Sequence, residues 1–391
     1  MKLSSRAHAA TESPTLGLTA KVNALKAAGE DIVGFTAGEP DFDTPEHIKE
    51  AAREALARGL TKYTPTAGTV GLRAAIVEKT QRDSGLTYEP KQVIVGCGGK
   101  HVLYLIFQAL LDPGDAVLIP APYWVSYVDQ TRLAGGAPLI VPTVEADDFK
   151  LQPAQLDAVL ALNPHVRALI LNSPSNPTGA TYSAAELAAL AAVLERYPQV
   201  VVIADEIYEH LTYGGVPFAS IAQVPGFQAR TVIVNGCSKA YSMTGWRIGW
   251  ALGDAALIGA MTRIASHETS NPTTIAQAGA EAALRGDQSA VETMRRAFEA
   301  RRTLIVDGLR ALPGVQCLEP TGAFYVFPNI AAHLGAGETA DEFAARLLEA
   351  SRVAVVPGNG FGAPDCVRLS YACSEANITA GLSRLAAFLG A

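Results

Sequence analysis

Short apolar segments recur through the first two-thirds of the chain, and segments with helical character separate most of them. They lie at residues 92–95, 116–120, 138–142, 166–171, 200–204 and 231–234. Strands that are apolar along their whole length are typical of a parallel sheet, because neither face of such a sheet meets water. The sequence therefore predicts an α/β fold with a mostly parallel central sheet covered by helices.

The pattern changes near residue 290. A charged helix expected over 291–310 is followed by short apolar segments at 315–318, 323–327, 353–356 and 367–370, with helices near 339–350 and at the C-terminus. The first forty residues show no strand ladder of their own, and we expect them to pack against this region. We predict a large domain over residues 44–290 and a smaller α+β domain made of residues 1–43 and 291–391.

The composition excludes several classes of protein. Apolar residues make up 49% of the 391 residues and charged residues 18%, which is typical of a densely packed globular protein and not of a disordered one. A net charge of -7 with no basic run argues against nucleic-acid binding. The five cysteines are scattered without metal-binding spacing, and we find neither a signal peptide nor an apolar run of membrane-spanning length. We therefore expect a cytoplasmic protein with no membrane attachment and no metal.

Four polar or glycine-rich segments begin just past predicted strands. They cover residues 96–100, 172–179, 205–208 and 238–247. Ligands of parallel sheets bind at the carboxyl ends of the strands. Because four such segments at four strand ends are unexpected by chance, we predict that they form a ligand site.

Lys239 lies in the last of these segments, with Ser238 before it and Arg247 eight positions later. A lysine that reacts as an amine needs a site that lowers its pKa, and the end of a buried strand can supply one. A serine hydroxyl and a planar guanidinium suit a phosphate. Together the three residues indicate a phosphate-bearing aldehyde held as a Schiff base, namely pyridoxal phosphate. The alternative is a surface lysine in a Gly/Ser turn.

Three further residues could serve such a cofactor. Asp205 ends an apolar strand, where a carboxylate needs a partner such as a protonated ring nitrogen; the alternative is a helix cap. Tyr208 could reach the phenolic oxygen of the cofactor or belong to the core. Asn176 lies between two prolines that fix its loop, so it could present its amide to a planar ligand or simply complete a turn.

For three more candidates, the sequence is compatible with either a ligand-binding role or a purely structural one. Arg368 is the only charged residue of an alternating strand, and it could bind a carboxylate or form a salt bridge at a sheet edge. Trp124 could stack on a flat ring or belong to the core. The backbone of residues 96–100 could bind an anion at a helix N-terminus, but this segment lacks the GxGxxG dinucleotide pattern.

Taken together, these residues resemble those of the class I/II (fold type I) pyridoxal-phosphate-dependent aminotransferases, over nearly the whole chain. The matching segments follow in the family's order at residues 37–42, 62–68, 98–100, 122–124, 172–179, 205–208, 238–247, 355–358 and 368–370. The resemblance implies the fold of that family, with a large cofactor-binding sheet and a smaller α+β domain.

The resemblance also implies roles toward the cofactor ring. Lys239 would form the internal aldimine and then, as the free amine, move a proton. Asp205 would pair with the ring nitrogen, and Trp124 would stack on the ring. Tyr208 and Asn176 would hydrogen-bond the 3-oxygen.

Further implied roles concern the cofactor phosphate. Ser238, Arg247 and the backbone of Gly99 and Lys100 would hold it. Tyr63 would reach it from the partner subunit, which implies an obligate homodimer whose active sites are shared between subunits.

The substrate side is implied in the same way. Arg368, the Gly38 backbone and Asn176 would bind the α-carboxylate, with Trp124 beside them. Residues 98–100 and 122–127 resemble the aspartate aminotransferase subgroup found in many bacteria, which implies ping-pong transamination between L-aspartate and 2-oxoglutarate. Since residues 266–272 offer no arginine, Lys100 is the candidate for the distal carboxylate, or else a solvated lysine.

Other activities on the same scaffold stay open. They are transamination of aromatic amino acids, alanine or prephenate, and a pyridoxal-phosphate β-lyase. A DNA-binding regulator with an aminotransferase-like domain is disfavoured, because no basic helices precede the sheet.

Overall fold

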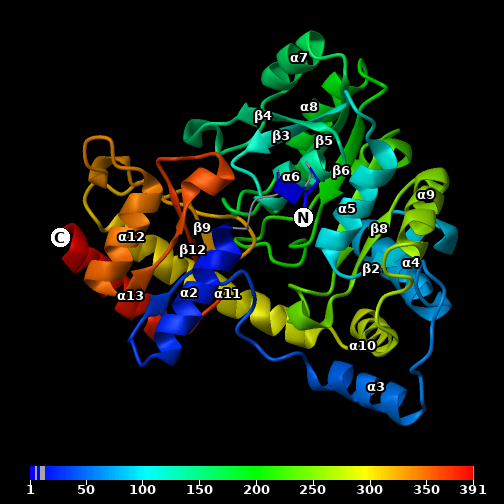
Figure 1. The fold of residues 1–391 in the computed structure, drawn as a ribbon, viewed down its shortest axis with the longest axis horizontal. Coiled ribbons are helices and arrows are strands. Elements are labelled where there is room, and N and C mark those ends of the chain that lie inside the picture. The colour runs from blue at the N-terminus through cyan, green and yellow to red at the C-terminus, as the bar shows by residue number, and fades with distance from the viewer. Residues whose placement is uncertain (5–6, 9–13, 391) are drawn as a thin grey trace.

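The computed structural model describes residues 1–4, 7–8 and 14–390 (Figure 1). Within these residues a seven-stranded sheet has the order β2-β8-β7-β6-β5-β3-β4. Its strands are β2 (Val93–Gly96), β3 (Ala116–Ala121), β4 (Ala137–Pro142), β5 (Val166–Asn172), β6 (Val201–Asp205), β7 (Thr231–Gly236) and β8 (Gly249–Leu252). Neighbouring strands are parallel except at β8, which is antiparallel to both β2 and β7. The predicted mostly parallel sheet is confirmed.

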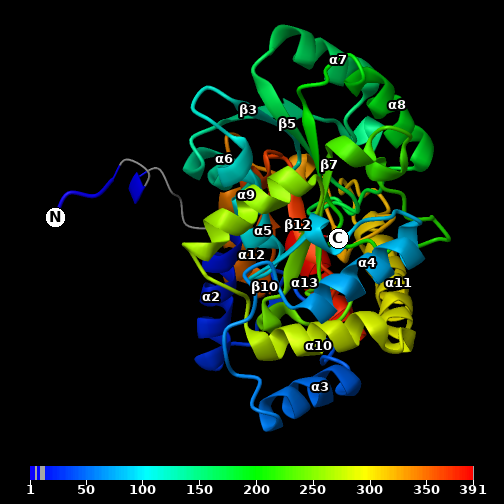
Figure 2. The ribbon, with the colours of Figure 1, turned by 90° about the vertical axis from the view of Figure 1, so that its right-hand side faces the viewer.

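Helices cover both faces of this sheet (Figures 1 and 2). They are α4 (Val70–Ser84), α5 (Gly99–Leu110), α6 (Ser126–Leu133), α7 (Pro153–Leu162), α8 (Ala184–Leu194), α9 (Ala255–Ser266) and α10 (Thr274–Arg285), and α3 (Glu46–Ala57) packs on the outside of α10. Successive strand residues point to opposite faces. Ile94 packs in one buried cluster with residues of α5 and α9, and its neighbour Val95 packs in another with residues of α4 and α10. Burial on both sides explains why the central strands are apolar throughout, whereas β4 at the sheet edge has Val141 as its one buried residue.

Residues of the types that favour helix termini occur at the ends of several helices. Ser183 Oγ accepts a 3.3 Å hydrogen bond from the Glu186 N–H at the start of α8, and Glu186 completes the capping box. Thr69 caps α4 in a similar way, and Gly85 ends that helix with a left-handed φ of 73° that suits glycine. None of the described helices is long and apolar enough to span a membrane.

A smaller group of elements lies beside the sheet (Figure 1). Its helices are α2 (Pro14–Ala27), α11 (Ser289–Arg310), α12 (Ala340–Ser351) and α13 (Glu375–Leu389). Its strands are β1 (Val33–Gly34), β9 (Tyr325–Val326), β10 (Val353–Ala354), β11 (Val356–Pro357) and β12 (Val367–Ser370). β1 pairs with β10 in parallel, and β11, β12 and β9 form an antiparallel sheet with β12 in the middle.

Two strand predictions for this group are wrong in detail. Residues 315–318 form no strand, and Gln316 makes only an isolated bridge with Asn329. Residues 353–356 do not form one strand but divide between β10 and β11, which belong to different sheets. A short apolar segment does not specify which strand it pairs with or whether it forms a strand at all, because the rest of the fold decides this.

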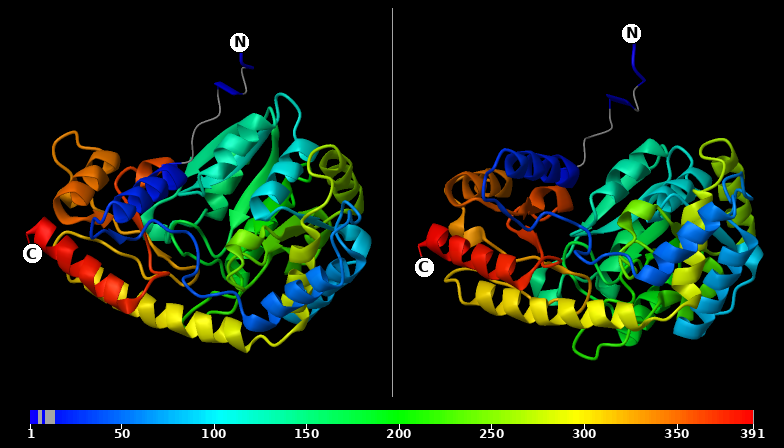
Figure 3. Two further views of the ribbon diagram at one scale, coloured as in Figure 1. Left: turned by 60° about the horizontal axis from the view of Figure 1, so that its bottom comes forward. Right: turned by 90° about the horizontal axis from the view of Figure 1, so that it is seen from below.

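The long helix α11 links the two groups of elements. In Figure 3 it runs along the lower side of the molecule, with α13 beside one end. Its Phe298 and Ile305 share a buried cluster with Phe35 of the N-terminal segment and with Tyr208 and Leu211, which follow β6. The core of the smaller group therefore reaches the strand ends of the large sheet.

Candidate active site

A cavity of about 460 Å³ lies at the carboxyl ends of the central strands. All the site residues predicted from the sequence line it except Tyr63: Gly38, Gly99, Lys100, Trp124, Asn176, Asp205, Tyr208, Ser238, Lys239, Arg247 and Arg368. Segments that follow β2, β5, β6 and β7 therefore meet at one place. They are joined there by β12 of the smaller group and by the N-terminal segment.

Lys239 lies in the turn after β7, where its Nζ donates a hydrogen bond to the carbonyl oxygen of Gly38. The pKa of Lys239 is lowered to about 8, first because burial penalises the ammonium and then because Arg368 and Arg247 bring positive charge. Roughly half of this side chain is a neutral amine at pH 8, whereas an ordinary lysine is almost fully charged there.

Asp205 ends β6 and is 5% exposed. Tyr127 Oη donates a 2.6 Å hydrogen bond to Asp205 Oδ2, and the Ile207 N–H approaches Oδ1 at 3.4 Å. Burial nevertheless raises the pKa of Asp205 to about 6. A cationic N–H donor in the cavity would offset this cost and keep the carboxylate charged.

Arg247, Ser238 and the start of α5 form one corner of the cavity. Arg247 has a left-handed φ of 56°, and its guanidinium donates to the carbonyl oxygens of Thr244 and Cys97 at 3.0 and 3.2 Å. Gly98 makes room for it, because a Cβ atom there would lie 2.5 Å from Arg247 Nη2. A guanidinium, a hydroxyl and a helix N-terminus are the groups that bind phosphate in proteins.

Arg368 forms another part of the wall and is 3% exposed. Its Nη1 donates to Asn176 Oδ1 and its Nη2 to the Thr36 carbonyl oxygen, both at 3.0 Å. No carboxylate pairs with Arg368 in the described part of the chain, and its buried Nε has no hydrogen-bond partner there. A salt bridge at a sheet edge is therefore ruled out, and a buried guanidinium with a free donor suits an incoming carboxylate.

Trp124 and Lys100 lie together at the cavity wall. Lys100 Nζ is 5.1 Å from the Trp124 ring centroid, and Trp124 packs edge-on against Tyr127 at 5.3 Å. Desolvation and the nearby charge of Arg247 lower the pKa of Lys100. Lys100 is thus a cation held at the cavity by an aromatic face.

Among the other residues that line the cavity, two tyrosines contact predicted site residues but were not themselves predicted. Tyr127 supports Asp205, and the Tyr325 hydroxyl lies 2.9 Å from the Tyr208 hydroxyl. The sequence around each of them does not distinguish it from an ordinary buried tyrosine. Tyr63 does not line the cavity, and 90% of its surface is exposed.

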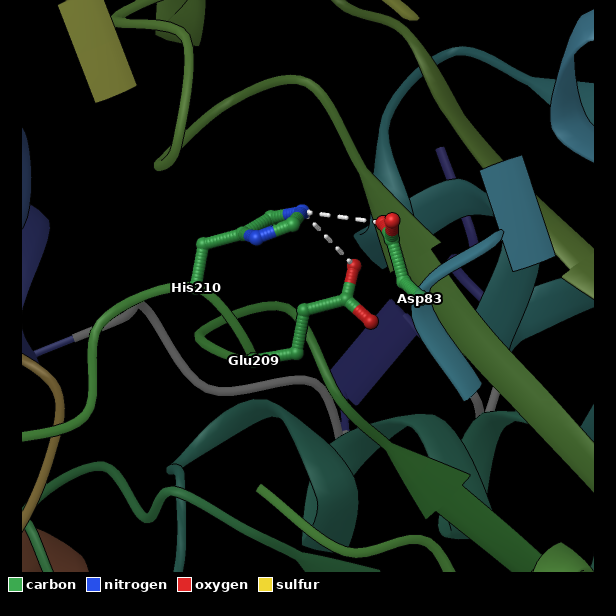
Figure 4. A group of neighbouring side chains, drawn as sticks. All are labelled: Asp83, Glu209 and His210. Carbon is green, nitrogen blue, oxygen red and sulfur yellow. Dashed lines mark ion pairs between the residues drawn. The ribbon is translucent and has the colours of Figure 1, made fainter. Parts of the chain in front are cut away.

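A second group of titratable residues lies outside this cavity (Figure 4). His210 Nε2 is 3.5 Å from Asp83 Oδ2 and from Glu209 Oε1. The buried Lys79 pairs with Glu209 and, at 3.2 Å, with Asp83. Since the lysine already supplies the positive charge that a metal ion would bring, we regard this group as a structural ion-pair network.

The comparison with known proteins decides the family. The model of the family "Aminotransferase class I and II" matches residues 30–385. The chain belongs to this family. It is therefore an enzyme, an aminotransferase, and its cofactor is pyridoxal phosphate.

Relatives of this aminotransferase match over full length. An "Aspartate aminotransferase" of Geobacillus stearothermophilus is 53% identical, with both chains covered completely. An "Aspartate/prephenate aminotransferase" of Nitrosomonas europaea is 45% identical, again over both complete chains. Among solved structures, the aspartate aminotransferase from Rhizobium meliloti has a TM-score of 0.95 at 44% identity, covering 100% of this chain and 99% of the other. The enzyme from Thermus thermophilus with maleate has a TM-score of 0.94 at 46% identity, with 99% of each chain covered.

The cavity of this aminotransferase fits its cofactor. Lys239 is an amine of lowered pKa, Asp205 is a buried carboxylate without a cationic hydrogen-bond donor among the described residues, and the Arg247 corner suits a phosphate. Each group therefore has a chemical counterpart in pyridoxal phosphate: the aldehyde, the ring nitrogen and the phosphate.

Proposed function

We propose that this aminotransferase transfers the amino group of L-aspartate to 2-oxoglutarate and so forms oxaloacetate and L-glutamate by a ping-pong mechanism. One observation carries the proposal: a single cavity holds Lys239, with its lowered pKa, together with Arg368 and Lys100, two cations in addition to Arg247 of the phosphate corner. A dicarboxylic amino acid needs one positive partner for each carboxylate. The names of the full-length relatives support the same substrate.

The residues around Lys239 would carry out the proton transfer. Pyridoxal phosphate supplies an aldehyde that takes up the amino group and a ring that withdraws electrons from the α-carbon. Lys239 Nζ, as a neutral amine, would take the proton from the substrate α-carbon and give it back later in the reaction. Asp205, held by Tyr127, would pair with the ring nitrogen and keep it protonated. Tyr208 and Asn176 would donate hydrogen bonds to the 3-oxygen.

Other residues would hold the cofactor in place. Ser238, Arg247 and the N–H groups of Gly99 and Lys100 would bind its phosphate, and Trp124 would stack on its ring. Since these contacts are independent of the reacting amine, they keep the cofactor oriented while the amino group is exchanged.

The two carboxylates of the substrate would bind to different cations. Arg368, whose Nε is free among the described residues, would bind the α-carboxylate, assisted by Asn176 and the Gly38 backbone. Lys100 would bind the distal carboxylate as a point charge. A substrate without that second carboxylate would lose the Lys100 contact, which is how the cavity would select aspartate and glutamate.

A second amino acceptor is supported by the name of one relative. The Nitrosomonas europaea protein is called an aspartate/prephenate aminotransferase and matches this chain over its full length. Prephenate carries two carboxylates, so the same two cations could bind it.

We further propose that the enzyme is a homodimer with shared active sites. Leu56, Leu60, Tyr63 and Val70 are large apolar residues with exposures of 57, 40, 90 and 68%, and they fall close together in the sequence. Such a group of exposed residues favours a protein interface. In this arrangement Tyr63 would contact the cofactor phosphate of the partner subunit.

We also propose the division into domains predicted above, with 44–290 as the cofactor-binding domain. Residues 1–43 and 291–391 (of which 5–6, 9–13 and 391 lie outside the described residues) would form the smaller domain. The pairing of β1 with β10 supports this grouping. The five free cysteines support a reducing compartment, and we place the enzyme in the cytoplasm.

Product analysis tests the proposed reaction. The purified holoenzyme is incubated with L-aspartate, with and without 2-oxoglutarate. We expect oxaloacetate and glutamate in equal amounts only when the acceptor is present. Release of ammonia together with a keto acid in the absence of an acceptor would instead identify a β-lyase.

A further inference from the structure

Two buried tyrosine hydroxyls face each other in the cavity wall. Tyr208 is 3% exposed and Tyr325 is 1% exposed, and their Oη atoms are 2.9 Å apart. Tyr208 follows β6 of the large sheet, whereas Tyr325 belongs to β9 of the smaller group. Within the described residues, neither hydroxyl has another hydrogen-bond partner.

Each hydroxyl of this pair carries a single hydrogen, so the direction of the hydrogen bond between them determines which hydroxyl can still donate to a ligand. A tyrosine hydroxyl has one hydrogen to donate and can also accept. If Tyr208 gave its hydrogen to Tyr325, it would have none for an acceptor in the cavity. If Tyr325 is the donor, the Tyr208 hydrogen is free, and accepting a hydrogen bond makes Tyr208 a stronger donor.

The nearby charges do not by themselves decide which tyrosine donates, because a cation lies beside each ring. The Arg368 guanidinium lies 4.5 Å from the centroid of the Tyr325 ring, and Lys239 Nζ lies 5.8 Å from the centroid of the Tyr208 ring. The proposed role of Tyr208 toward the 3-oxygen decides instead, because the Tyr208 hydrogen stays free for that acceptor only when Tyr325 donates.

We propose that Tyr325 is a positioning residue that acts through Tyr208: it donates its hydrogen to the Tyr208 oxygen and leaves the Tyr208 hydrogen pointing at the 3-oxygen of the cofactor. The proposal rests on the proposed function, because it uses the role of Tyr208 toward that oxygen. Through Tyr325, the smaller group of elements would then support the cofactor site as well as bind the substrate.

The test is the pH at which the visible absorption of the bound cofactor changes, measured on holoenzyme without substrate. A hydrogen bond to the negatively charged 3-oxygen favours the deprotonated form of the cofactor, so a weaker bond raises this midpoint. For Tyr325→Phe we expect a rise of about half a pH unit, a threefold change in proton affinity. Replacing Tyr325 with 3-fluorotyrosine, a stronger donor that keeps the side-chain shape, should shift the midpoint downward.

A double-mutant cycle separates this role from a purely structural one. In a Tyr208→Phe background, Tyr325→Phe should leave the midpoint unchanged, because its effect passes through Tyr208. The matched control is Tyr371→Phe, since Tyr371 is also fully buried and donates to a carbonyl oxygen, that of Ala323, at 3.1 Å. This control should lower thermal stability without moving the midpoint.

Either of two results would overturn the proposal. One is an unchanged midpoint in Tyr325→Phe and in the fluorotyrosine protein. The other is the same shift with or without the Tyr208 hydroxyl. Both are distinct from failure of the proposed function, in which the unaltered protein itself would show no transamination.

Discussion

Lys239, Asp205 and Arg368 are charged side chains held largely out of water, and each has fewer opposite charges around it than a buried charge needs. Such an arrangement costs stability, and it is typical of sites that a ligand completes. All three could be recognised from the sequence, because Asp205 and Arg368 are lone charges within apolar strands and Lys239 follows closely on one. Tyr127 and Tyr325 could not, since the sequence around a buried tyrosine is the same whether it supports a catalytic group or only the core.

The lowered pKa of Lys239 predicts a pH dependence of cofactor attachment. Only the neutral amine reacts with an aldehyde, so the rate at which apoenzyme takes up pyridoxal phosphate should rise from pH 7 and level off above about pH 9. Stopped-flow absorbance measures this rate. A rate still rising tenfold per unit up to pH 10 would mean that the pKa of the reacting lysine is not lowered. In Lys239→Ala the covalent phase and turnover should both be absent, although the phosphate site should still retain cofactor.

The position of Lys100 predicts a selective effect on substrates. Lys100→Ser should lower kcat/KM for aspartate by about tenfold to a hundredfold, the range expected for loss of a charged hydrogen bond. Alanine turnover should change little, because alanine has no distal carboxylate. The control is Lys91→Ser, a surface lysine paired with Glu89 at 2.7 Å, which should affect neither substrate. Equal losses on aspartate and alanine would exclude the proposed role of Lys100.

At the scale of elements, the strand ends of the large sheet bring the site together. The strands of the large sheet were predictable because each is an apolar run, with the exception of β8. That strand is only four residues long and follows directly on the turn that carries Arg247, so the sequence shows no separate segment. The division of residues 353–356 between two sheets was not predictable either, because it depends on the distant β1, whose Val33 pairs with Val353.

The turn before α5 predicts a further mutational effect. Gly98→Ala combines a positive φ of 86° with a Cβ atom that would lie 2.5 Å from Arg247 Nη2, so Arg247 must move. We expect at least about tenfold weaker binding of pyridoxal phosphate, and little change for pyridoxal, which lacks the phosphate. Gly226→Ala is the matched control, because Gly226 has a φ of 85° but open space around its Cβ position. Fluorescence titration of the apoenzymes measures both affinities, and equal behaviour of the two variants would contradict the assignment of a phosphate site.

At the scale of the whole molecule, the cavity draws on both groups of elements. Asp205 ends β6 and Lys239 follows β7 of the large sheet, whereas Arg368 belongs to the smaller group. Cofactor chemistry and recognition of the α-carboxylate are therefore placed on different parts of the structure. That division was visible in the sequence only as a change of pattern near residue 290, because contacts between distant segments leave no local signal.

The proposed dimer predicts complementation between inactive subunits. Lys239→Ala and Tyr63→Ala proteins, co-expressed, should form heterodimers with one intact site built from the unaltered Lys239 of one subunit and Tyr63 of the other. With random pairing we expect roughly a quarter of the activity of the unaltered enzyme, assayed at limiting cofactor. In the control, the double variant Lys239→Ala/Tyr63→Ala is co-expressed with Tyr63→Ala protein, a mixture in which no dimer contains an intact site. A mixture no more active than its separate components would argue against shared sites.

The most direct measurement for the whole account is the first half-reaction of the holoenzyme with single amino acids. Absorbance follows the conversion of the bound cofactor from its aldehyde form to its amine form. We predict fast conversion by aspartate and glutamate and much slower conversion by alanine and phenylalanine, because only the dicarboxylic substrates engage both Arg368 and Lys100. Similar rates for all four amino acids, or faster conversion by phenylalanine, would contradict the proposed selection of dicarboxylic substrates.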